Sequence, residues 1–305
     1  MKEIIVELSH NCNLSCIMCG FGGKPISKER FMTWGTLDRI LDQLPCAPER
    51  IRLNGRGESL IHPDFVQMLG HVRAKFPTSV VNLFSNLSIS SLKTMQALID
   101  YDVQLFVSID SPDPKELEAI RKGASFSNIE RNLDLLQNAK RRPYAIFTIQ
   151  EDNLHRLVEM TKYCTEKEMH IIFNTVRRDE GIEPFVELVK SKRAELIENY
   201  KKIRSLCADN GLACLLPDSI HGIFVAEGTS QVFGNLESCP AFKEELCFHF
   251  DGVVTPCNMF NPYEYGNILD NDLDTILSGD RYLWFVENHK SYYYCANCAC
   301  MGGTA

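Results

Sequence analysis

The sequence lacks any long apolar run. No stretch approaches the roughly 18 apolar residues of a membrane-spanning helix, so we expect no membrane contact. The opening segment MKEIIVELSHNC has one lysine but no apolar h-region, which excludes a secretory signal. These two absences predict a cytoplasmic protein.

Positive charge is also in short supply. Lys and Arg number 32 against 40 Asp and Glu, which gives a net charge of −8. A partner bound mainly through phosphates is therefore not expected, which argues against nucleic acid and anionic membrane surfaces. A small anionic substrate held by a few arginines stays compatible with this charge. Only 18 of the 305 residues are Gly and 13 are Pro, too few for a fibrous or low-complexity chain.

Cysteine, by contrast, is abundant and unevenly placed. There are 13 cysteines, and a reducing cytosol disfavours structural disulfides, so clustered cysteines indicate metal binding or catalysis. Four of them lack metal-ligand spacing and are interpreted as structural: Cys46, Cys164, Cys207 and Cys214. The others gather near the start, at Cys12, Cys16 and Cys19, and in the last fifth, at Cys239, Cys247, Cys257, Cys295, Cys298 and Cys300.

Six strand–helix units are predicted between residue 3 and about residue 176. Strands alternating with helices imply a parallel sheet with right-handed crossovers. We expect strands that are apolar on both faces, as when helices cover both sides of a sheet. Periodicity alone leaves open a doubly wound sheet or a partly closed barrel. The expected strands span residues 3–8, 50–55, 79–85, 104–110, 144–150 and 170–176.

The pattern changes after the sixth unit. Residues 182–210 predict a long charged helix or helix pair, and Gly211 is a plausible C-cap. The last residues read as a hairpin, a turn and a short helix, with cysteines at both ends. A module this small needs added stability, which metal ligation supplies. The predicted divisions are 1–180 (core), 181–235 (helical insert or linker) and 236–305 (cysteine-rich domain).

A cysteine loop follows the first predicted strand. Cys12-x3-Cys16-x2-Cys19 places three thiolates where they can cap three corners of one iron–sulfur cube, which leaves the fourth iron open. The competing interpretations are chance clustering and a zinc knuckle with a remote fourth ligand.

The motif CNLSCIMC, followed by GRGESL after the second strand, resembles the radical S-adenosylmethionine (SAM) superfamily. The resemblance implies a partial (β/α)6 barrel, with Cys12, Cys16 and Cys19 holding a [4Fe–4S] cluster whose open iron chelates SAM. It further implies that one electron cleaves SAM, and that the resulting 5′-deoxyadenosyl radical takes hydrogen from a substrate. An external electron donor of the flavodoxin or ferredoxin type is expected.

Further positions match this family's SAM contacts. Gly57-Glu58 stands in a GGE-type motif, where the carboxylate accepts from the SAM ammonium and the glycine permits close backbone approach. Ser85-Asn86 resembles the family's TNG turn, although Leu87 replaces the glycine.

The fourth strand and the segment after it supply two more expected SAM contacts. Ser108 and Arg121 are expected at the SAM carboxylate, for which an arginine offers a planar fork. All the expected contacts follow strands, and ligands of parallel sheets bind beyond the strands' carboxyl ends.

The tail resembles the SPASM and twitch extensions of the same superfamily. This likeness implies one auxiliary [4Fe–4S] cluster on Cys239, Cys257, Cys295 and Cys298, in the shorter twitch form, with Cys300 idle or substituting for a neighbour. A zinc ribbon from the same four cysteines is the alternative. Asp251-Gly252 is a strong hairpin signal, and the turn would bring the four thiolates together.

Cys247 lies outside this four-ligand set. It is a buried small hydrophobe, a ligand of a second and incomplete cluster, or a hydrogen donor, as in some epimerases of this superfamily. Asn258 occupies the position at which related oxidising maturases carry an aspartate base. Arg177 and Arg178 follow the last strand and either anchor a polar or anionic substrate or belong to a solvated loop.

These features predict a radical SAM enzyme acting on a small polar metabolite. The core begins at residue 3, which leaves no leader-binding domain, and the insert 182–235 would cover the barrel mouth. An aminosugar, an aminocyclitol or another antibiotic precursor fits best, and a peptide remains open. Epimerisation with Cys247 as hydrogen donor is the preferred interpretation, and dehydrogenation of a secondary alcohol, in which the auxiliary cluster accepts an electron, is the alternative. An iron–sulfur electron carrier without catalysis is the alternative of another class.

Overall fold

The computed structural model describes residues 2–88, 91–176, 185–220, 223–225, 239, 244–258 and 263–296. Its main feature is a ten-stranded sheet in the order β14-β13-β12-β1-β3-β4-β5-β7-β8-β9. Six consecutive members form the predicted parallel series: β1 (Glu3–Val6), β3 (Arg50–Arg52), β4 (Val80–Ser85), β5 (Gln104–Ser108), β7 (Tyr144–Ile149) and β8 (His170–Thr175).

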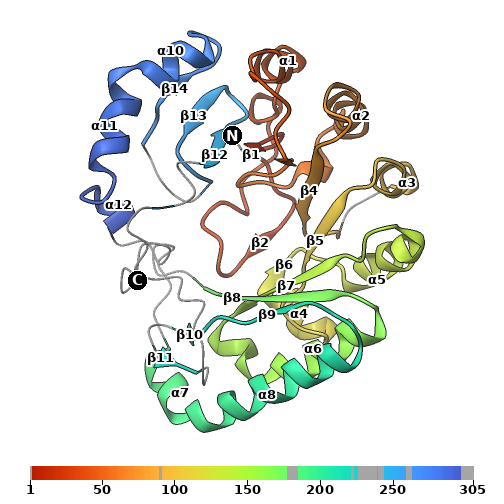
Figure 1. Cartoon of the computed structure of the whole chain (residues 1–305). Helices are drawn as coiled ribbons and strands as arrows, with labels where there is room; N and C mark the ends of the chain where they lie inside the picture. The colour runs from red at the N-terminus through yellow and green to blue at the C-terminus, as the bar shows by residue number, and fades with distance from the viewer. Residues whose placement is uncertain are drawn as a thin grey trace.

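These six strands stand side by side in chain order, which decides between the two architectures left open by the sequence. Each crossover steps in the same direction, and right-handed crossovers that do so put every helix on one face of the sheet. Figure 1 shows the helices ranged around the outside of the curved sheet. The chain is therefore a partial barrel rather than a doubly wound sheet. Its outer helices are α1 (Trp34–Asp42), α2 (Phe65–Lys75), α3 (Leu92–Asp100), α4 (Pro114–Ile120), α5 (Phe126–Leu135) and α6 (Leu157–Glu166).

Local sequence signals explain where these helices begin. Thr33, Ser91 and Ser125 each accept a hydrogen bond from a backbone amide in the first turn that follows, as N-caps do. Asp113 caps α4 in the same way, and Pro114 follows at the first helical position, where a missing amide costs nothing. Short 3-10 turns complete the connections: η1 (Lys28–Arg30), η2 (Ser59–Ile61), η3 (Leu136–Asn138) and η4 (Glu151–Arg156).

The two faces of the sheet differ in chemistry. The outer face is apolar: Ile4, Ile51 and Leu83 are fully buried in the core cluster against the helices. The alternate positions on the inner face carry polar, charged and aromatic side chains, such as Glu3 and Arg52. The expectation of strands apolar on both faces was wrong, because helices cover only the outside and the inner face lines the barrel interior.

Side chains of five neighbouring strands stack across the inner face. Arg52 lies over the ring of Phe84 at 5.3 Å, and Phe84 stacks on Phe106 at 4.3 Å between ring centroids. Phe106 stacks in turn on Tyr144, which meets His170. The interior is thus lined by rings and polar groups together.

The sheet ends on one side beyond the predicted helical stretch. Helices α7 (Val186–Ser191) and α8 (Arg193–Asp209) follow β8, and Gly211, with φ +62°, ends the second helix as expected. Strand β9 (Cys214–Leu215) then adds in parallel to β8. Strands β10 (Ser219–Ile220) and β11 (Ile223–Phe224) form a separate antiparallel pair. No helix of the described residues is both long and apolar enough to cross a membrane.

The tail joins the other edge of the same sheet. Strand β12 (Glu245–Phe248) pairs in parallel with β1, and β13 (Val253–Thr255) returns antiparallel to it after a turn at Gly252, whose φ is +87°. Strand β14 (Gly266–Asn267) completes this edge. The predicted hairpin is confirmed, and it extends the barrel sheet. Figure 1 shows its helices beside it: α10 (Leu273–Ser278), α11 (Asp280–Asn288) and α12 (Tyr293–Ala296).

Candidate functional site

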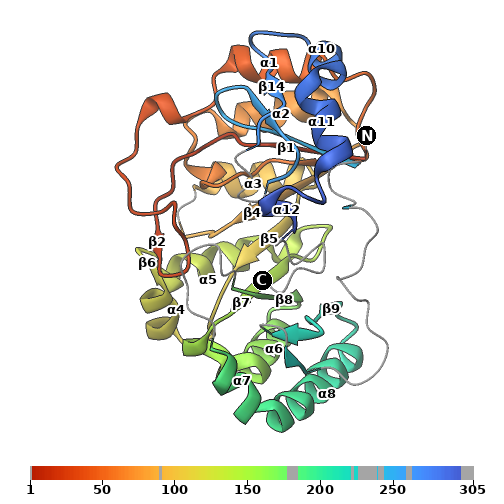
Figure 2. The same ribbon diagram turned by 90° about the vertical axis from the view of Figure 1, so that its left-hand side faces the viewer.

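Backbone pairing holds the cysteine loop at the carboxyl ends of the strands. Its short strand β2 (Ser15–Cys16) pairs antiparallel with β6 (Arg121–Lys122), so that Cys16 lies opposite Arg121. The Ile17 amide also donates to the Ile120 carbonyl at 2.9 Å. Figure 2 shows β2 and β6 side by side at one side of the molecule. The loop after β1 thereby reaches the segment that follows α4.

The GGE-type segment holds the same loop from its other side. The Glu58 amide donates to the Asn11 carbonyl at 2.7 Å. A Cβ on Gly57 would lie 2.3 Å from the Asn11 oxygen and 2.4 Å from the Ser9 oxygen. No side chain fits in that space, so the close approach requires glycine.

The Glu58 carboxylate ties together the ends of β3 and β4. Its oxygens accept from the Ser85 hydroxyl at 2.9 Å, the Asn86 amide at 2.8 Å and the Leu60 amide at 3.1 Å. Burial raises the pKa of Glu58 above its usual range, although these three donors favour the charged form. The structure thus gathers three of the predicted SAM-contact residues at one point. An ionised carboxylate has about four lone-pair positions, so these three donors of the described residues leave one acceptor position of Glu58 over.

The Asn86 side chain continues this network to the cysteine loop. It donates to the Asn13 side-chain oxygen at 3.0 Å. The Nδ2 group of Asn13 is buried and has no hydrogen-bond partner among the described residues. A buried donor of this kind calls for an acceptor that the chain itself does not provide.

Arg121 is placed by an acid that the sequence analysis did not assign. Its Nε lies 2.7 Å from Oδ2 of Asp110, and both side chains are buried. The other oxygen of Asp110 accepts from the Thr148 amide at 2.7 Å. Nη1 of Arg121 is also 3.9 Å from the Cys16 sulfur, which puts positive charge beside that thiol. Ser108 ends β5 on the inner face, half-buried.

The thiols of the loop are suited to a cluster. Burial raises the pKa of Cys12 to about 12, with Glu58 and the neighbouring thiols adding to it, and burial also raises that of Cys16. A thiolate at Cys12 therefore needs nearby positive charge, which a metal cluster provides. No three Cys, His, Asp or Glu side chains of the described residues converge on a single-ion site. Cysteine thiolates are the ligands that iron–sulfur clusters take, so the residue types of the loop fit a [4Fe–4S] cluster.

The tail cysteines are described only in part. Burial raises the pKa of the Tyr265 hydroxyl, and the Cys257 and Cys295 thiols add to this rise. Cys239 is half-buried and packs against the core. Cys298 and Cys300 lie outside the described residues, as do Arg177 and Arg178. The soft thiolate set suits an iron–sulfur cluster, and its membership stays a prediction.

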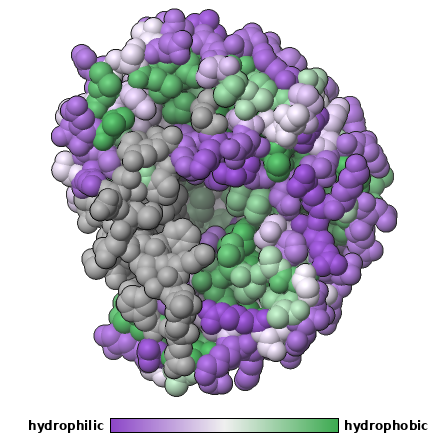
Figure 3. Space-filling model, viewed as in Figure 1, coloured by the Kyte–Doolittle hydropathy of each residue, from purple (hydrophilic) through white to green (hydrophobic). Residues whose placement is uncertain are grey.

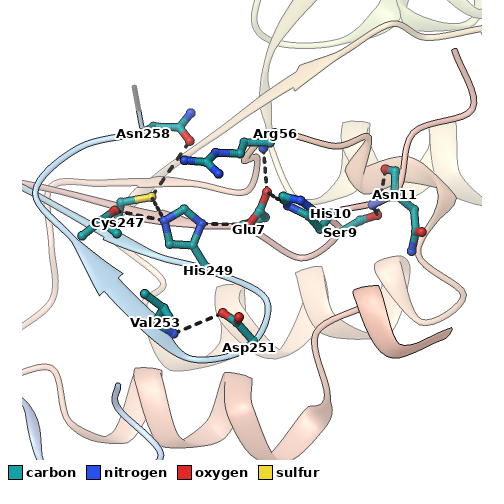
Figure 4. A network of polar contacts seen from close by, with 11 residues as sticks. Glu7, Ser9, His10, Asn11, Arg56, Cys247, His249, Asp251, Val253 and Asn258 are labelled. Carbon is teal, nitrogen blue, oxygen red and sulfur yellow. Dashed lines mark hydrogen bonds and ion pairs between the residues drawn. The ribbon is translucent and has the colours of Figure 1, made fainter. Parts of the chain in front are cut away.

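Cys247 is fully buried on β12, next to a second polar network (Figure 4). Its sulfur lies 4.0 Å from Nε2 of His249 and 4.0 Å from Oδ1 of Asn258. Nε2 of His249 is 3.0 Å from the Thr255 hydroxyl, and Nδ1 is 2.9 Å from Oε2 of Glu7. Glu7, a residue of the barrel's first segment, thus meets the tail hairpin.

Glu7 is fully buried and has several donors. Burial alone would raise its pKa, but hydrogen bonds from His10 and His249 and from the Arg56 amide lower it to about 2. The side chain is therefore an anion at neutral pH. Sequence reasoning missed this network, although Glu3 and Glu7 recur on one face of a strand expected to be apolar, which was the available signal.

Comparisons with known proteins agree with this geometry. The model of the radical SAM superfamily matches residues 6–164, and that of the SPASM iron-sulfur cluster-binding domain matches residues 239–299. A tungsten-containing aldehyde ferredoxin oxidoreductase cofactor-modifying protein of Pyrococcus furiosus is 23% identical, with 98% of this chain and 87% of that protein covered.

Two solved structures with bound SAM share the fold. Native anSMEcpe with bound AdoMet has a TM-score of 0.70 at 18% identity, covering 99% of this chain and 89% of that one. Streptococcus suis SuiB bound to S-adenosylmethionine has a TM-score of 0.68 at 13% identity, covering 92% of this chain and 66% of SuiB. Together the two family models imply [4Fe–4S] clusters in both parts of the chain. The radical SAM model matches more than half of the residues of this chain, so the chain belongs to the radical SAM superfamily.

Proposed function

We propose that the protein is a radical SAM epimerase that inverts one carbon of a small polar substrate, with Cys247 as the hydrogen donor. The bound cluster supplies the electron that cleaves SAM and so yields the radical that removes hydrogen from the substrate. The chain's own residues bind SAM, orient the substrate, exclude water and return hydrogen to the opposite face.

The ends of β3, β4 and β5 are assigned to SAM. Cys12, Cys16 and Cys19 would hold the cluster, and the free acceptor position of Glu58 would take the SAM ammonium. Arg121, fixed by Asp110, would offer its remaining donors to the SAM carboxylate. Gly57 keeps this end compact, while Ser108 at the end of β5 completes the proposed contacts.

The orientation of Cys247 is the observation that carries the proposal. Its neighbours on β12, Leu246 and Phe248, belong to the outer apolar core, whereas Cys247 is buried but does not. Side chains alternate along a strand, so its thiol points to the inner face. There its partners are His249 and Asn258, and Asn258 has no basic group that could deprotonate an oxidised intermediate.

The inner face also supports a small polar substrate. It carries charged and polar side chains together with the ring stack from Phe84 to Tyr144. Figure 3, in the view of Figure 1, shows a hollow near the centre of the molecule. The Pyrococcus furiosus relative is named for modifying an enzyme cofactor, which agrees with a small-molecule substrate. We favour an aminosugar, an aminocyclitol or a related natural-product precursor.

The test is an anaerobic assay in D2O. Reconstituted protein, SAM and dithionite are incubated with a panel of aminosugars and aminocyclitols, and 5′-deoxyadenosine and product masses are measured. Wild type should give an inverted product with one added deuterium, because thiol hydrogens exchange with solvent. Cys247→Ala should consume SAM without inverting the substrate, and Cys164→Ala, which alters a buried cysteine of the outer core, should behave as wild type.

Other results would assign the reaction differently. A product two mass units lighter than substrate, from wild type and Cys247→Ala alike, would establish dehydrogenation. Inversion in a peptide added in a parallel assay, with no compound of the panel converted, would refute the substrate class and keep the chemistry. Absence of 5′-deoxyadenosine with every compound would favour an electron carrier.

A further inference from the structure

Four side chains form a continuous polar chain from the first barrel strand to the thiol. Glu7 holds Nδ1 of His249 at 2.9 Å, and Nε2 of the same ring lies 3.0 Å from the Thr255 hydroxyl and 4.0 Å from the Cys247 sulfur. Each of the four is buried. Figure 4 shows the imidazole of His249 between the carboxylate of Glu7 and the sulfur of Cys247.

We infer that His249, positioned by Glu7, is the proton donor that restores the Cys247 thiol after each turnover. This inference rests on the proposed hydrogen-donor role of Cys247. It assigns to the hairpin a proton relay in addition to the thiol itself, and it gives Glu7 the task of holding the imidazole in place.

The hydrogen bonds of His249 orient its ring for proton transfer at Nε2. An ionised carboxylate only accepts, so Nδ1 must carry hydrogen toward Glu7. The Thr255 hydroxyl donates its single hydrogen to the Cys257 carbonyl at 3.1 Å. Nε2 of His249 faces the Thr255 oxygen and the Cys247 sulfur, so a proton that Nε2 carries lies beside the thiol. The buried anion of Glu7 favours the ring while it holds that proton.

The groups around the ring define the relay's surroundings. The second oxygen of Glu7 is occupied by His10 at 3.1 Å and by the Arg56 amide at 2.7 Å. The ring of His10 stacks on Phe250 at 5.1 Å, next to His249 in the chain. These contacts leave Nε2 of His249 directed at the Thr255 hydroxyl and the Cys247 sulfur.

The Cys247 S–H bond breaks homolytically, its hydrogen atom forms a C–H bond with the substrate radical, and a thiyl radical remains. One electron from a donor of the flavodoxin or ferredoxin class and one proton from Nε2 of His249 then restore S–H. The sulfur is reduced, the donor is oxidised by one electron, and solvent returns the proton to His249.

The test measures hydrogen exchange at the thiol without turnover. In apo-protein, the infrared S–H band of Cys247 is isolated as the difference between wild type and Cys247→Ala, and its conversion to S–D in D2O is timed. His249→Gln should slow this exchange by a factor of about 100, within the range of general acid–base transfer. Imidazole added to His249→Gly should restore part of the rate. His62→Gln, which alters a buried histidine outside this network, should leave it unchanged.

Glu7→Gln gives a second measurement if His249→Gln fails to fold. It keeps the shape of the side chain and removes the anion, so exchange should slow there too. Unchanged exchange in every folded variant of His249 and Glu7 would overturn the relay.

Turnover separates this inference from the proposed function. With the panel compound that wild type inverts, His249→Gln should form about one product per protein and then stall. Repeated inversion by His249→Gln at the wild-type rate would refute the relay and keep Cys247 as donor. A dehydrogenated product from wild type would remove the donor role and the relay together.

Discussion

Two buried glutamates, at the ends of neighbouring strands, have different hydrogen-bond donors and opposite pKa shifts. Glu58 accepts from two backbone amides and one hydroxyl, all neutral, and burial raises its pKa. Glu7 accepts from two imidazoles and one amide, and its pKa falls to about 2. Both side chains are almost completely shielded from solvent.

The difference in pKa between Glu58 and Glu7 comes from their hydrogen-bond partners and not from the degree of burial. Neutral donors leave a buried carboxylate short of positive charge, so Glu58 still gains from a cationic ligand. Glu7 accepts from two imidazoles and an amide, and these hydrogen bonds favour its charged form. The contrast supports the proposed ammonium site at Glu58 and the proposed relay at the β1–β12 junction.

The largest effect should come from removing the cluster at the β3 end of this comparison. Wild type should hold about eight irons, as two [4Fe–4S] clusters. Changing Cys12, Cys16 and Cys19 together to Ala should abolish 5′-deoxyadenosine formation and leave about four irons on the tail. Iron analysis and chromatography check both. If wild type held one zinc and about four irons, the tail cysteines would bind zinc in place of the auxiliary cluster.

SAM affinity should separate the two glutamates next. Glu58→Ala and Arg121→Ala each remove a charge-assisted hydrogen bond worth roughly 1.5–3 kcal/mol. The SAM dissociation constant, measured by equilibrium dialysis on reconstituted protein, should therefore rise more than about tenfold in each. Glu7→Gln is the matched control and should leave it unchanged. Equal losses from Glu7→Gln would show that the two networks act as one.

Arg121→Ala has a second expected cost, in stability. It leaves Asp110 buried without its ion-pair partner, which typically costs about 3–5 kcal/mol. The pair Arg121→Met with Asp110→Asn should recover much of this in urea unfolding. SAM affinity should stay low in the double variant, because no guanidinium returns.

The pH dependence of stability should have opposite signs for the two glutamates. The folded pKa of Glu7, about 2, lies below its usual 4.5, so its ionisation stabilises the fold above pH 4.5. This contribution, about 3 kcal/mol, should fade between pH 4.5 and 2 and be absent from Glu7→Gln. The pKa of Glu58 is raised, so its contribution should fall as pH rises above 4.5. Urea unfolding of apo-protein checks both, and slopes of the same sign would contradict the comparison.

The smallest effect should come from the turn that carries His249. Gly252 has φ +87°, and a Cβ there would lie 2.6 Å from the Asn267 side-chain oxygen. Gly252→Ala should lower the free energy of unfolding by about 1–2 kcal/mol. Gly211→Ala is the matched control, since φ is +62° there but no atom lies within 4 Å of the added carbon. The thermal unfolding temperature of Gly252→Ala should be lower than that of Gly211→Ala, and SAM affinity should be intact in both variants.

Local patterns gave much of the fold. The six strand–helix units and the turn at Gly252 rest on neighbours in sequence, so periodicity and turn chemistry predicted them. The resemblance on the cysteine loop and the residues after the strands likewise identified Glu58, Ser85 and Asn86, which the structure brings together.

Non-local pairing gave the rest and could not be predicted in this way. Nothing in the sequence near Glu245 states that its strand pairs with Glu3. The Glu7–His249 contact joins residues 242 positions apart for the same reason. The inner face was expected to be apolar because periodicity does not reveal on which side the helices lie. The sequence analysis did not identify Asp110 as the partner of Arg121, because only the fold brings the two side chains within 2.7 Å.

The parallel pairing of β12 with β1 also has a consequence for how the chain folds. Until the tail is made, β1 is an open sheet edge whose backbone groups can pair with another chain. Contacts between segments this distant carry a large loop-closure cost and form late, so the exposed edge persists during synthesis. A nascent or truncated chain that lacks β12 should therefore aggregate. In the complete fold, β12 covers the edge of β1 and prevents its pairing with another chain.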